Sequence, residues 1–444
     1  MPPSSATNTP ADDPLSANTI GPEPATPRST RPGFLYAFSA LKHRNYRLYW
    51  FGQLISLIGT WMQATGIAWL VLQVTHSAWQ LGVVSALQYL PVLLFALLGG
   101  VFADRWPKRE LLLVTQAVAM VQAIIFYALV ITHTIQLWEI ALLAFLLGIT
   151  TSLDQPTRQA FVVEMVGREE LPNAIALNSS MGSLVRILGP ALGGLIISLG
   201  GVDPLFLLNA MSFIAALSGL ALIDRRALHY PDHPADTPLQ SMWQSLREGI
   251  MYSWQSPAIL LIIWVAGLVL LWGANFTVIL PVFATDVLHV GANGFGALSS
   301  ALGVGALLGG IWLAWRQPRM TIHAFLLSLF LFGALDFSFA LSLNVYLSAI
   351  LIASISAVEA IYAAQSITVL QAMTPDRLRG RVMSVAIFFF TGSAPLGFLL
   401  AGWLTALCGA SLGLLICAML IFLTVAVGWI WRDRAEHDLA AHMV

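Results

Sequence analysis

The chain is poor in charged residues. Asp, Glu, Lys and Arg make up 10% of its 444 residues, whereas an ordinary soluble domain carries about 25%. Hydrophobic residues make up 58%, and the mean hydropathy is +0.79. This composition excludes a water-soluble enzyme and indicates a protein that lies in lipid. The formal net charge is −1, which gives no reason to expect nucleic acid as a partner.

Cysteine and the common catalytic motifs are also scarce. The two cysteines, Cys408 and Cys417, lie in apolar stretches without the paired spacing of a disulfide framework or a metal site. No P-loop and no HExxH ligand set occurs. We therefore expect no metal, no cofactor and no enzymatic activity.

Residues 1–33 contain eight prolines among small polar residues and have no apolar run long enough for a secretory signal. We interpret this segment as a disordered N-terminal tail. Membrane insertion must then depend on segments of the mature chain.

A helix needs about 20 mostly apolar residues to cross the hydrocarbon core of a bilayer. Twelve segments of the sequence meet this requirement. Their approximate spans are 49–73, 80–103, 110–132, 137–156, 174–200, 204–223, 257–284, 292–315, 321–342, 345–370, 381–408 and 410–431. The sequence therefore predicts an all-α membrane protein with twelve transmembrane helices.

The basic residues indicate the orientation. Lys and Arg collect on the cytoplasmic side of membrane proteins. Of the 21 in this chain, 20 lie in the two tails, just before the first span, or in the second, fourth, sixth, eighth and tenth segments between spans. The exception is Arg186. This alternation predicts a multi-pass protein with both termini in the cytoplasm. We expect it in the cytoplasmic (inner) membrane of a bacterium, in contact with the lipid bilayer.

The longest gap divides the chain into two halves that resemble each other. Residues 164–176 and 371–383 are similar in sequence and precede corresponding spans, as in transporters built from internal repeats. We expect two pseudosymmetric six-helix bundles at 34–223 and 257–431. Between them we expect a cytoplasmic linker at 224–256 with an amphipathic helix, and after them a cytoplasmic tail at 432–444.

A ten-residue motif lies between the second and third spans. Its specified positions are Gly100, Asp104, Arg105, Lys108 and Arg109. It resembles the signature G-x-x-x-D-R-x-x-[RK]-[RK] of the major facilitator superfamily. We interpret it as a conformational latch, in which the Asp104 carboxylate accepts hydrogen bonds from the N-terminus of a neighbouring helix.

Further motifs narrow the resemblance. The stretches 154–159, 168–178, 186–194 and 379–384 resemble the branch of that superfamily that contains enterobactin exporters and macrolide efflux proteins. The resemblance implies a secondary active transporter that exports a small amphipathic molecule, such as a drug or siderophore, by proton antiport and alternating access. Alternatives are an importer or a lipid transporter of the same fold, or a non-transporting membrane sensor. We expect a monomer.

The fifth span combines a glycine-proline motif with a charge. Gly189, Pro190, Gly193 and Gly194 partly match the antiporter motif of the superfamily, but they equally suit a packing face without a role in coupling. Arg186 lies near the middle of the same span. A central charge is costly in lipid and must face a partner or water, so we predict a buried charge with either a functional or a structural role.

Two acidic residues also fall within spans. Glu359 of span ten shares a helical face with Ser356 and Tyr362, and burial there disfavours the anion, which favours a role in proton coupling. Direct contact with a cationic substrate and a static ion pair are alternatives. Asp336 of span nine is a second candidate for proton coupling.

Polar residues on otherwise apolar spans mark candidates for a substrate cavity. We predict that they bind a small-molecule substrate, although such side chains also hold helices together. The candidates are Gln53, Thr60, Gln63, Gln88, Asn275, Ser356 and Tyr362.

Overall fold

The computed structural model of the protein describes residues 34–167, 169–229, 239–273, 275–316 and 321–443, with the backbone alone for 34–37, 96–105, 239–246, 376 and 440–443. Helices form almost all of these residues, and no strand occurs among them. An apolar chain in lipid satisfies its backbone N–H and C=O groups within its own helices. The predicted all-α class is therefore confirmed.

The first half of the chain forms six long helices. A short 3₁₀ helix, η1 (Phe34–Lys42), precedes them, and η2 (Arg225–Ala227) follows. The six are α1 (Arg44–Thr75), α2 (Ala78–Arg105), α3 (Lys108–Ile131), α4 (Leu137–Val166), α5 (Leu171–Gly200) and α6 (Asp203–Ala221). Within this bundle α1 packs on α5 and α6, α2 on α4, and α3 on α4 and α6.

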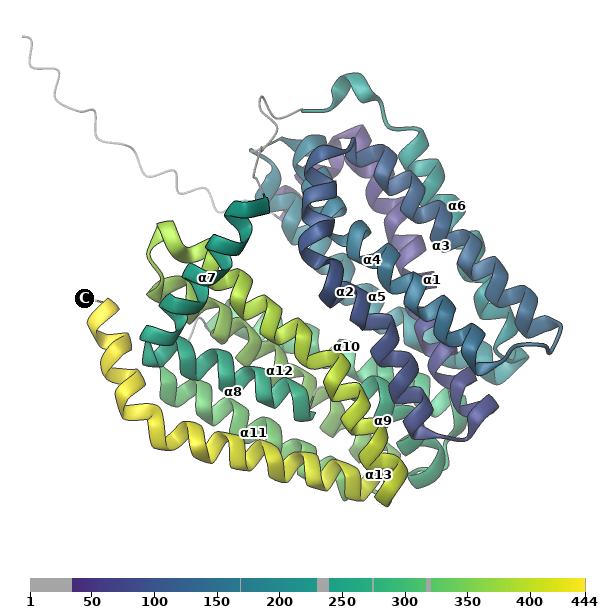
Figure 1. The fold of residues 1–444 in the computed structure, drawn as a ribbon. Coiled ribbons are helices and arrows are strands. Elements are labelled where there is room, and N and C mark those ends of the chain that lie inside the picture. The colour runs from purple at the N-terminus through teal and green to yellow at the C-terminus, as the bar shows by residue number, and fades with distance from the viewer. Residues whose placement is uncertain (1–33, 168, 230–238, 274, 317–320, 444) are drawn as a thin grey trace, which may run out of the picture.

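The second half repeats this arrangement after one additional helix. The elements are α7 (Leu239–Gln255), α8 (Pro257–Gly273), α9 (Phe276–Val282), η3 (Phe283–Val287), α10 (Gly291–Arg316), α11 (Ile322–Ala340), α12 (Val345–Met373) and α13 (Asp376–Met443). Helix α8 packs on α13, α10 on α12, and α11 on α12 and α13. Figure 1 shows the two bundles side by side, with α7 on the second.

The predicted spans differ from the structure at two places. Helix α13 holds both span eleven and span twelve, because only Gly409 (φ 83°, ψ 165°) interrupts it. This conformation favours glycine. Eleven helical segments of the described chain are long and apolar enough to cross a membrane, and this division of α13 makes twelve spans.

Span seven is the other departure, because it is interrupted rather than continuous. Helix α8 ends at Gly273 and α9 begins at Phe276. The Asn275 side-chain nitrogen donates to the carbonyls of Leu271 (2.8 Å) and Trp272 (3.2 Å). An asparagine thus satisfies carbonyls that the end of α8 leaves without helical partners.

The two bundles meet through two equivalent helix pairs. Helix α5 packs on α10, and α2 packs on the first part of α13. A shift of six spans converts one pair into the other, as expected for a pseudo-two-fold relation. A Cβ atom on Gly194 would stand 2.7 Å from the Gly296 Cα, and one on Gly82 would stand 3.1 Å from the Gly402 Cα. All four glycines lie toward the ends of the spans that are remote from the termini.

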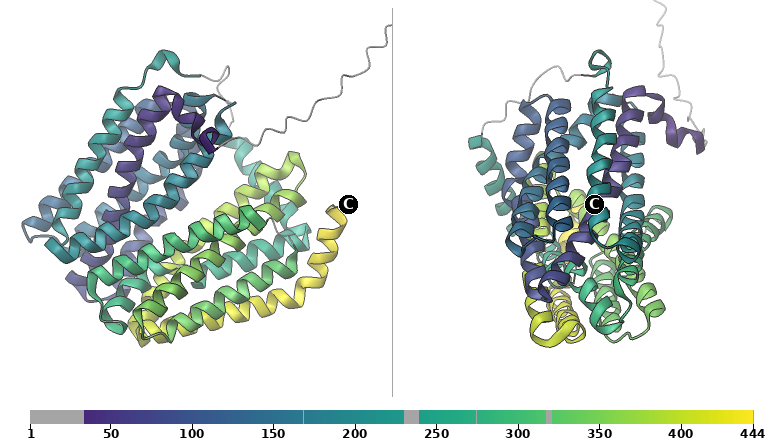
Figure 2. Two further views of the ribbon diagram at one scale, coloured as in Figure 1. Left: turned by 180° about the vertical axis from the view of Figure 1, so that it is seen from behind. Right: turned by 90° about the vertical axis from the view of Figure 1, so that its right-hand side faces the viewer.

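The bundles part toward the side that carries α7 and the end of α13. A Cβ atom on Gly182 of α5 or Gly310 of α10 would have no neighbour within 4 Å. Figure 1 and the left view of Figure 2 show this divergence. The molecule is therefore closed on the side away from the termini and open on the terminus side.

Candidate functional site

Arg186 lies at the centre of the molecule, where the two bundles face each other. Its guanidinium carbon stands 5.5 Å from the centre of the Trp61 ring of α1. The arginine interacts electrostatically with Glu359 of α12, in the other bundle, and with Tyr89 of α2. These partners place its charge in the space between the bundles.

The expectation of a buried Arg186 is wrong, because the side chain is exposed between the bundles. Helix α5 forms part of the contact between bundles, so the face that carries Arg186 borders that space, while Gly189 and Gly193 face α1. No carboxylate in the described part of the chain lies within 4 Å of the guanidinium. Arg186 therefore forms no contact ion pair with Glu359 in this conformation.

Glu359 is half-buried, while its neighbours on the same helical face lie deeper. Ser356 is 6% exposed and Tyr362 is 1% exposed. The Tyr362 ring packs edge-on against Phe332 of α11, and its hydroxyl has no hydrogen-bond partner. The structure thus places Ser356 and Tyr362 within the second bundle rather than on a cavity wall, and only Glu359 borders the space between bundles.

Asp336 on α11 is fully buried in the second bundle. Its exposed fraction is 0%, and among the described residues neither carboxylate oxygen has a hydrogen-bond partner. It interacts electrostatically with Tyr362 of α12 and with Cys417 of α13. A buried polar group without a hydrogen-bond partner costs about 1–3 kcal/mol.

The polar stripe of α1 faces the core of the first bundle. Gln63 donates to the side chain of Gln122 (3.2 Å) and accepts from Asn209 (2.7 Å). Gln53 is 1% exposed, and its amide has no partner. The prediction that Gln53 and Gln63 line a cavity is therefore wrong, because a helix at the centre of a bundle uses polar side chains to bind its neighbours.

The other cavity candidates divide into two groups. Asn275 is 1% exposed and caps α8, so it too is not on a cavity wall. Thr60 and Gln88 are partly exposed. They remain candidates, together with Trp61 and Tyr89, which were not predicted from the sequence.

The glycine-proline motif of α5 is a packing surface. A Cβ on Gly189 would stand 2.3 Å from the Trp61 Cβ, and one on Gly193 would stand 3.1 Å from the Thr65 Cβ, so these two glycines face α1. Gly194 faces α10 instead. Pro190 lies within the continuous helix α5 and does not break it.

The latch motif is only partly described. At Gly100, Asp104 and Arg105 the structure describes only the backbone. The proposed contact of the Asp104 carboxylate therefore stays a prediction. Lys108 Nζ lies 2.8 Å from Glu164 Oε1 of α4, and both side chains are largely buried.

Arg109 binds within the same bundle. Its side chain donates to the carbonyls of Leu220 and Ala221, each at 2.8 Å. Helix α6 ends at Ala221, so the arginine satisfies carbonyls at its C-terminus. Lys108 and Arg109 thus hold α3 against α4 and α6.

A polar cavity lies between the bundles on the side away from the termini. Its volume is about 610 Å³. The first bundle contributes Gln73 and His76, and the second contributes Thr285, Asp286 and Thr405. Since both bundles form its walls, any movement between them changes this cavity.

The chain matches the family described as transmembrane secretion effector over residues 35–442. The chain belongs to this family of the major facilitator superfamily. The predicted superfamily and its twelve-helix fold are therefore confirmed. A transporter family also bears out the prediction that the chain is not an enzyme.

Curated relatives cover most of the chain. The staphyloferrin A transporter of Staphylococcus aureus is 25% identical over 77% of this chain and 85% of its own length. The multidrug efflux pump Tap of Mycolicibacterium fortuitum is 25% identical over 88% and 96%. The enterobactin exporter EntS of Citrobacter koseri is 27% identical over 79% and 83%. The protein is thus a multi-pass membrane transporter of small molecules.

Solved structures show the same fold. An inward-facing, occupied bacterial homologue of the lysosomal transporter Spinster superposes with a TM-score of 0.71 at 14% identity, over 89% of this chain and 98% of that one. An inward-facing bacterial homologue of the iron transporter ferroportin gives 0.65 at 17% identity, over 88% and 99%. At these identities the likeness concerns the fold alone.

Proposed function

We propose that the protein exports a small amphipathic molecule from a bacterial cell in exchange for protons, by alternating access of a site between its two bundles. The relatives that export siderophores and drugs support this class of cargo. The protein acts as a monomer in the cytoplasmic membrane, with both termini in the cytoplasm. The terminus side, which is open here, then faces the cytoplasm.

The observation that carries the proposal is the electrostatic interaction between Arg186 and Glu359 across the two bundles. They come from α5 and α12, interact electrostatically, and are not in contact. Closing the terminus side changes their separation. Because the attraction between opposite charges grows as they approach, the charge on Glu359 is coupled to the conformation.

Glu359 serves as the proton-coupling carboxyl in this scheme. When it is neutral, its attraction to Arg186 is lost and the open terminus side is free to accept cargo. Each proton that moves down a membrane potential of 100 mV supplies about 2.3 kcal/mol. The Arg186 guanidinium carbon stands 5.5 Å from the centre of the Trp61 ring.

Asp336 provides a second protonatable group. It is buried behind Tyr362, which lies one helical turn from Glu359 and interacts electrostatically with both carboxyl groups. A neutral Asp336 is compatible with its unpartnered environment, and an ionised one requires rearrangement of the bundle. A proton on Asp336 thus favours the conformation described here.

The test uses everted vesicles from cells that lack endogenous exporters. Wild-type protein should accumulate enterobactin, staphyloferrin A or a macrolide when the vesicle lumen is made more acidic than the medium, with measurable proton release from the lumen. Glu359→Gln should abolish gradient-driven accumulation but retain cargo exchange. Glu139→Gln, which changes an exposed carboxylate in the first turn of α4, is the matched control and should transport normally.

Two outcomes would contradict the proposal. Full gradient-driven accumulation in Glu359→Gln excludes the coupling role of that residue. Accumulation only in right-side-out vesicles reverses the direction and makes the protein an importer.

A further inference from the structure

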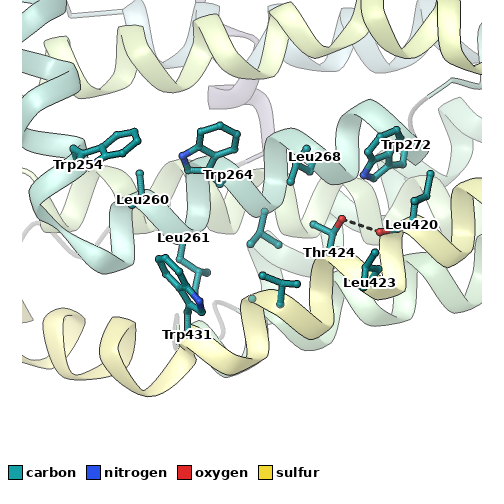
Figure 3. Close-up of a pocket in the computed structure, with 13 residues that line it drawn as sticks. Trp254, Leu260, Leu261, Trp264, Leu268, Trp272, Leu420, Leu423, Thr424 and Trp431 are labelled. Atoms are coloured by element: carbon teal, nitrogen blue, oxygen red, sulfur yellow. Dashed lines mark hydrogen bonds between the residues drawn. The ribbon is translucent and has the colours of Figure 1, made fainter.

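An apolar groove runs along the membrane-spanning part of the second bundle. Its walls are α8 and the last part of α13, and its volume is about 520 Å³. Four tryptophans line it: Trp254, Trp264, Trp272 and Trp431. Figure 3 shows them along the groove, with the leucines of α8 facing those of α13.

Apart from the indole N–H groups of its four tryptophans, the groove carries few polar groups. Its one hydroxyl, on Thr424, donates to the carbonyl of Leu420 at 2.7 Å, the dashed line in Figure 3. Large apolar side chains on its walls are exposed: Leu423 is 62% exposed and Val427 is 50% exposed. Such a surface suits a hydrocarbon chain rather than a polar solute.

The length of the groove fits one leaflet of a bilayer. Leu260 and Trp272 of α8 both line it, and twelve residues of helix rise about 18 Å. One leaflet contributes about 15 Å, half of the hydrocarbon core. An acyl chain that lies along α8 can therefore fill the groove from the membrane surface to mid-membrane.

Two arginines lie on the helices that carry Trp254 and Trp431, within two helical turns of these tryptophans. Arg247 precedes Trp254 by seven residues on α7, and Arg434 follows Trp431 by three on α13, so each shares the helical face of its tryptophan. Both arginines are exposed, and neither pairs with a carboxylate in the part of the chain that the structure describes.

Neighbouring acidic groups are already engaged. Glu248 pairs with Arg381, Asp433 pairs with Arg432, and Asp438 accepts from Ser256. Within the part of the chain that the structure describes, the two arginines therefore have no carboxylate as a counterion.

We propose that this groove binds one acyl chain of an anionic phospholipid, whose phosphate is held by Arg247 and Arg434. The site is separate from the space between Arg186 and Glu359, and it does not depend on the cargo or on proton coupling. Only the leaflet, the cytoplasmic one, rests on the orientation proposed above. Anionic lipids are attracted to basic residues at that surface.

The test counts lipids bound to the purified full-length protein by native mass spectrometry. The delipidated protein is incubated with dioleoyl phosphatidylglycerol or with dioleoyl phosphatidylcholine, which has the same chains and no net charge. We expect tighter binding of phosphatidylglycerol. The Arg247→Gln/Arg434→Gln variant should lose about 30-fold in its affinity for phosphatidylglycerol, at about fivefold for each arginine.

Three further variants separate the parts of the site. Val427→Trp fills the groove and should reduce binding of both lipids. Arg247→Lys/Arg434→Lys keeps the charges and should bind phosphatidylglycerol nearly as well as wild type. Arg316→Gln removes an exposed arginine from the end of α10, outside the groove, and should change nothing. Thermal unfolding confirms that each variant is folded.

The proposal is overturned if wild-type protein binds both lipids equally, or if the double glutamine variant and Val427→Trp bind phosphatidylglycerol as wild type does. A dimer that Val427→Trp dissociates would also overturn it, because the occupant would then be a second copy of the chain. All these measurements are independent of transport, so the outcome leaves the proposed function untouched.

Discussion

Gly194 of α5 and Gly296 of α10 meet backbone to backbone across the two bundles. A Cβ on Gly194 would lie 2.7 Å from the Gly296 Cα, and one on Gly296 would lie 2.6 Å from the Gly194 Cα. No side chain fits between these helices, so the closed side of the molecule depends on glycine at both positions.

We therefore expect Gly194→Ala to disfavour this conformation by about 1–3 kcal/mol, the usual cost of overpacking. A cysteine placed at Gln73, on the wall of the polar cavity, should then react faster with a membrane-impermeant maleimide, and thermal unfolding should begin earlier. Gly182→Ala and Gly310→Ala, in the same two helices but without neighbours within 4 Å, are the controls. Equal behaviour of all three variants would contradict the prediction.

The Lys108–Glu164 pair should contribute strongly to the stability of the first bundle. Removing one partner of a buried pair costs about 3–5 kcal/mol, so Lys108→Met should lower the free energy of unfolding by about 3 kcal/mol. The double variant Lys108→Met/Glu164→Leu should recover much of this loss. Arg225→Gln, which breaks the exposed pair with Glu110, should cost less than about 1 kcal/mol.

The contact between η1 and α5 should weaken in acid. Hydrogen bonds from Ser39 and Asn173 hold the pKa of Glu170 below its ordinary value of 4.5. A lowered pKa in the folded state stabilises the contact fully above that ordinary value, and the stabilisation is lost as the pH falls through the lowered pKa.

This loss can be followed by the fluorescence anisotropy of a dye on Lys42→Cys, with Cys408 and Cys417 replaced by alanine. The anisotropy should fall below about pH 4.5. Glu170→Gln should show a lower anisotropy without that pH dependence. A transition of unchanged size in Glu170→Gln would assign it to another group.

Asp336 should lower the stability of the protein. A buried polar group without a partner costs about 1–3 kcal/mol, so the near-isosteric Asp336→Val should raise the free energy of unfolding by about 1 kcal/mol. The same variant should impair gradient-driven transport if Asp336 carries a proton. A destabilised variant would show that Asp336 has a stabilising partner instead.

The sequence predicted the fold because lipid leaves a chain few alternatives. Apolar runs of about 20 residues must form helices, and the alternation of basic residues fixed their number. The break at Asn275 was not predicted, because hydropathy does not show where a helix is interrupted. The boundary between spans eleven and twelve, by contrast, was predicted at Gly409, where the structure interrupts α13.

The site was harder to predict, because helical spacing shows which residues share a face but not what that face meets. Gln63 and Tyr362 lie on clear polar stripes, and both face bundle interiors. Trp61 and Tyr89 carry no polar pattern, yet they surround Arg186. The isolated charges Arg186 and Glu359 were informative, since the cost of a charge in lipid requires a polar setting.

Helix α7 is fastened to the second bundle at three points: the Glu248–Arg381 pair, the hydrogen bond from Tyr252 to the Met373 carbonyl, and the junction with α8 at Ser256. On the other side, the backbone of His229 donates to the Glu164 carbonyl of the first bundle, at 2.8 Å. Each of these contacts thus belongs to one bundle or the other, and in the sequence the segment 230–238 connects His229 to α7. Two polypeptides expressed separately, 1–229 and 239–444, would each retain these contacts and should reassemble in the membrane without a covalent tether.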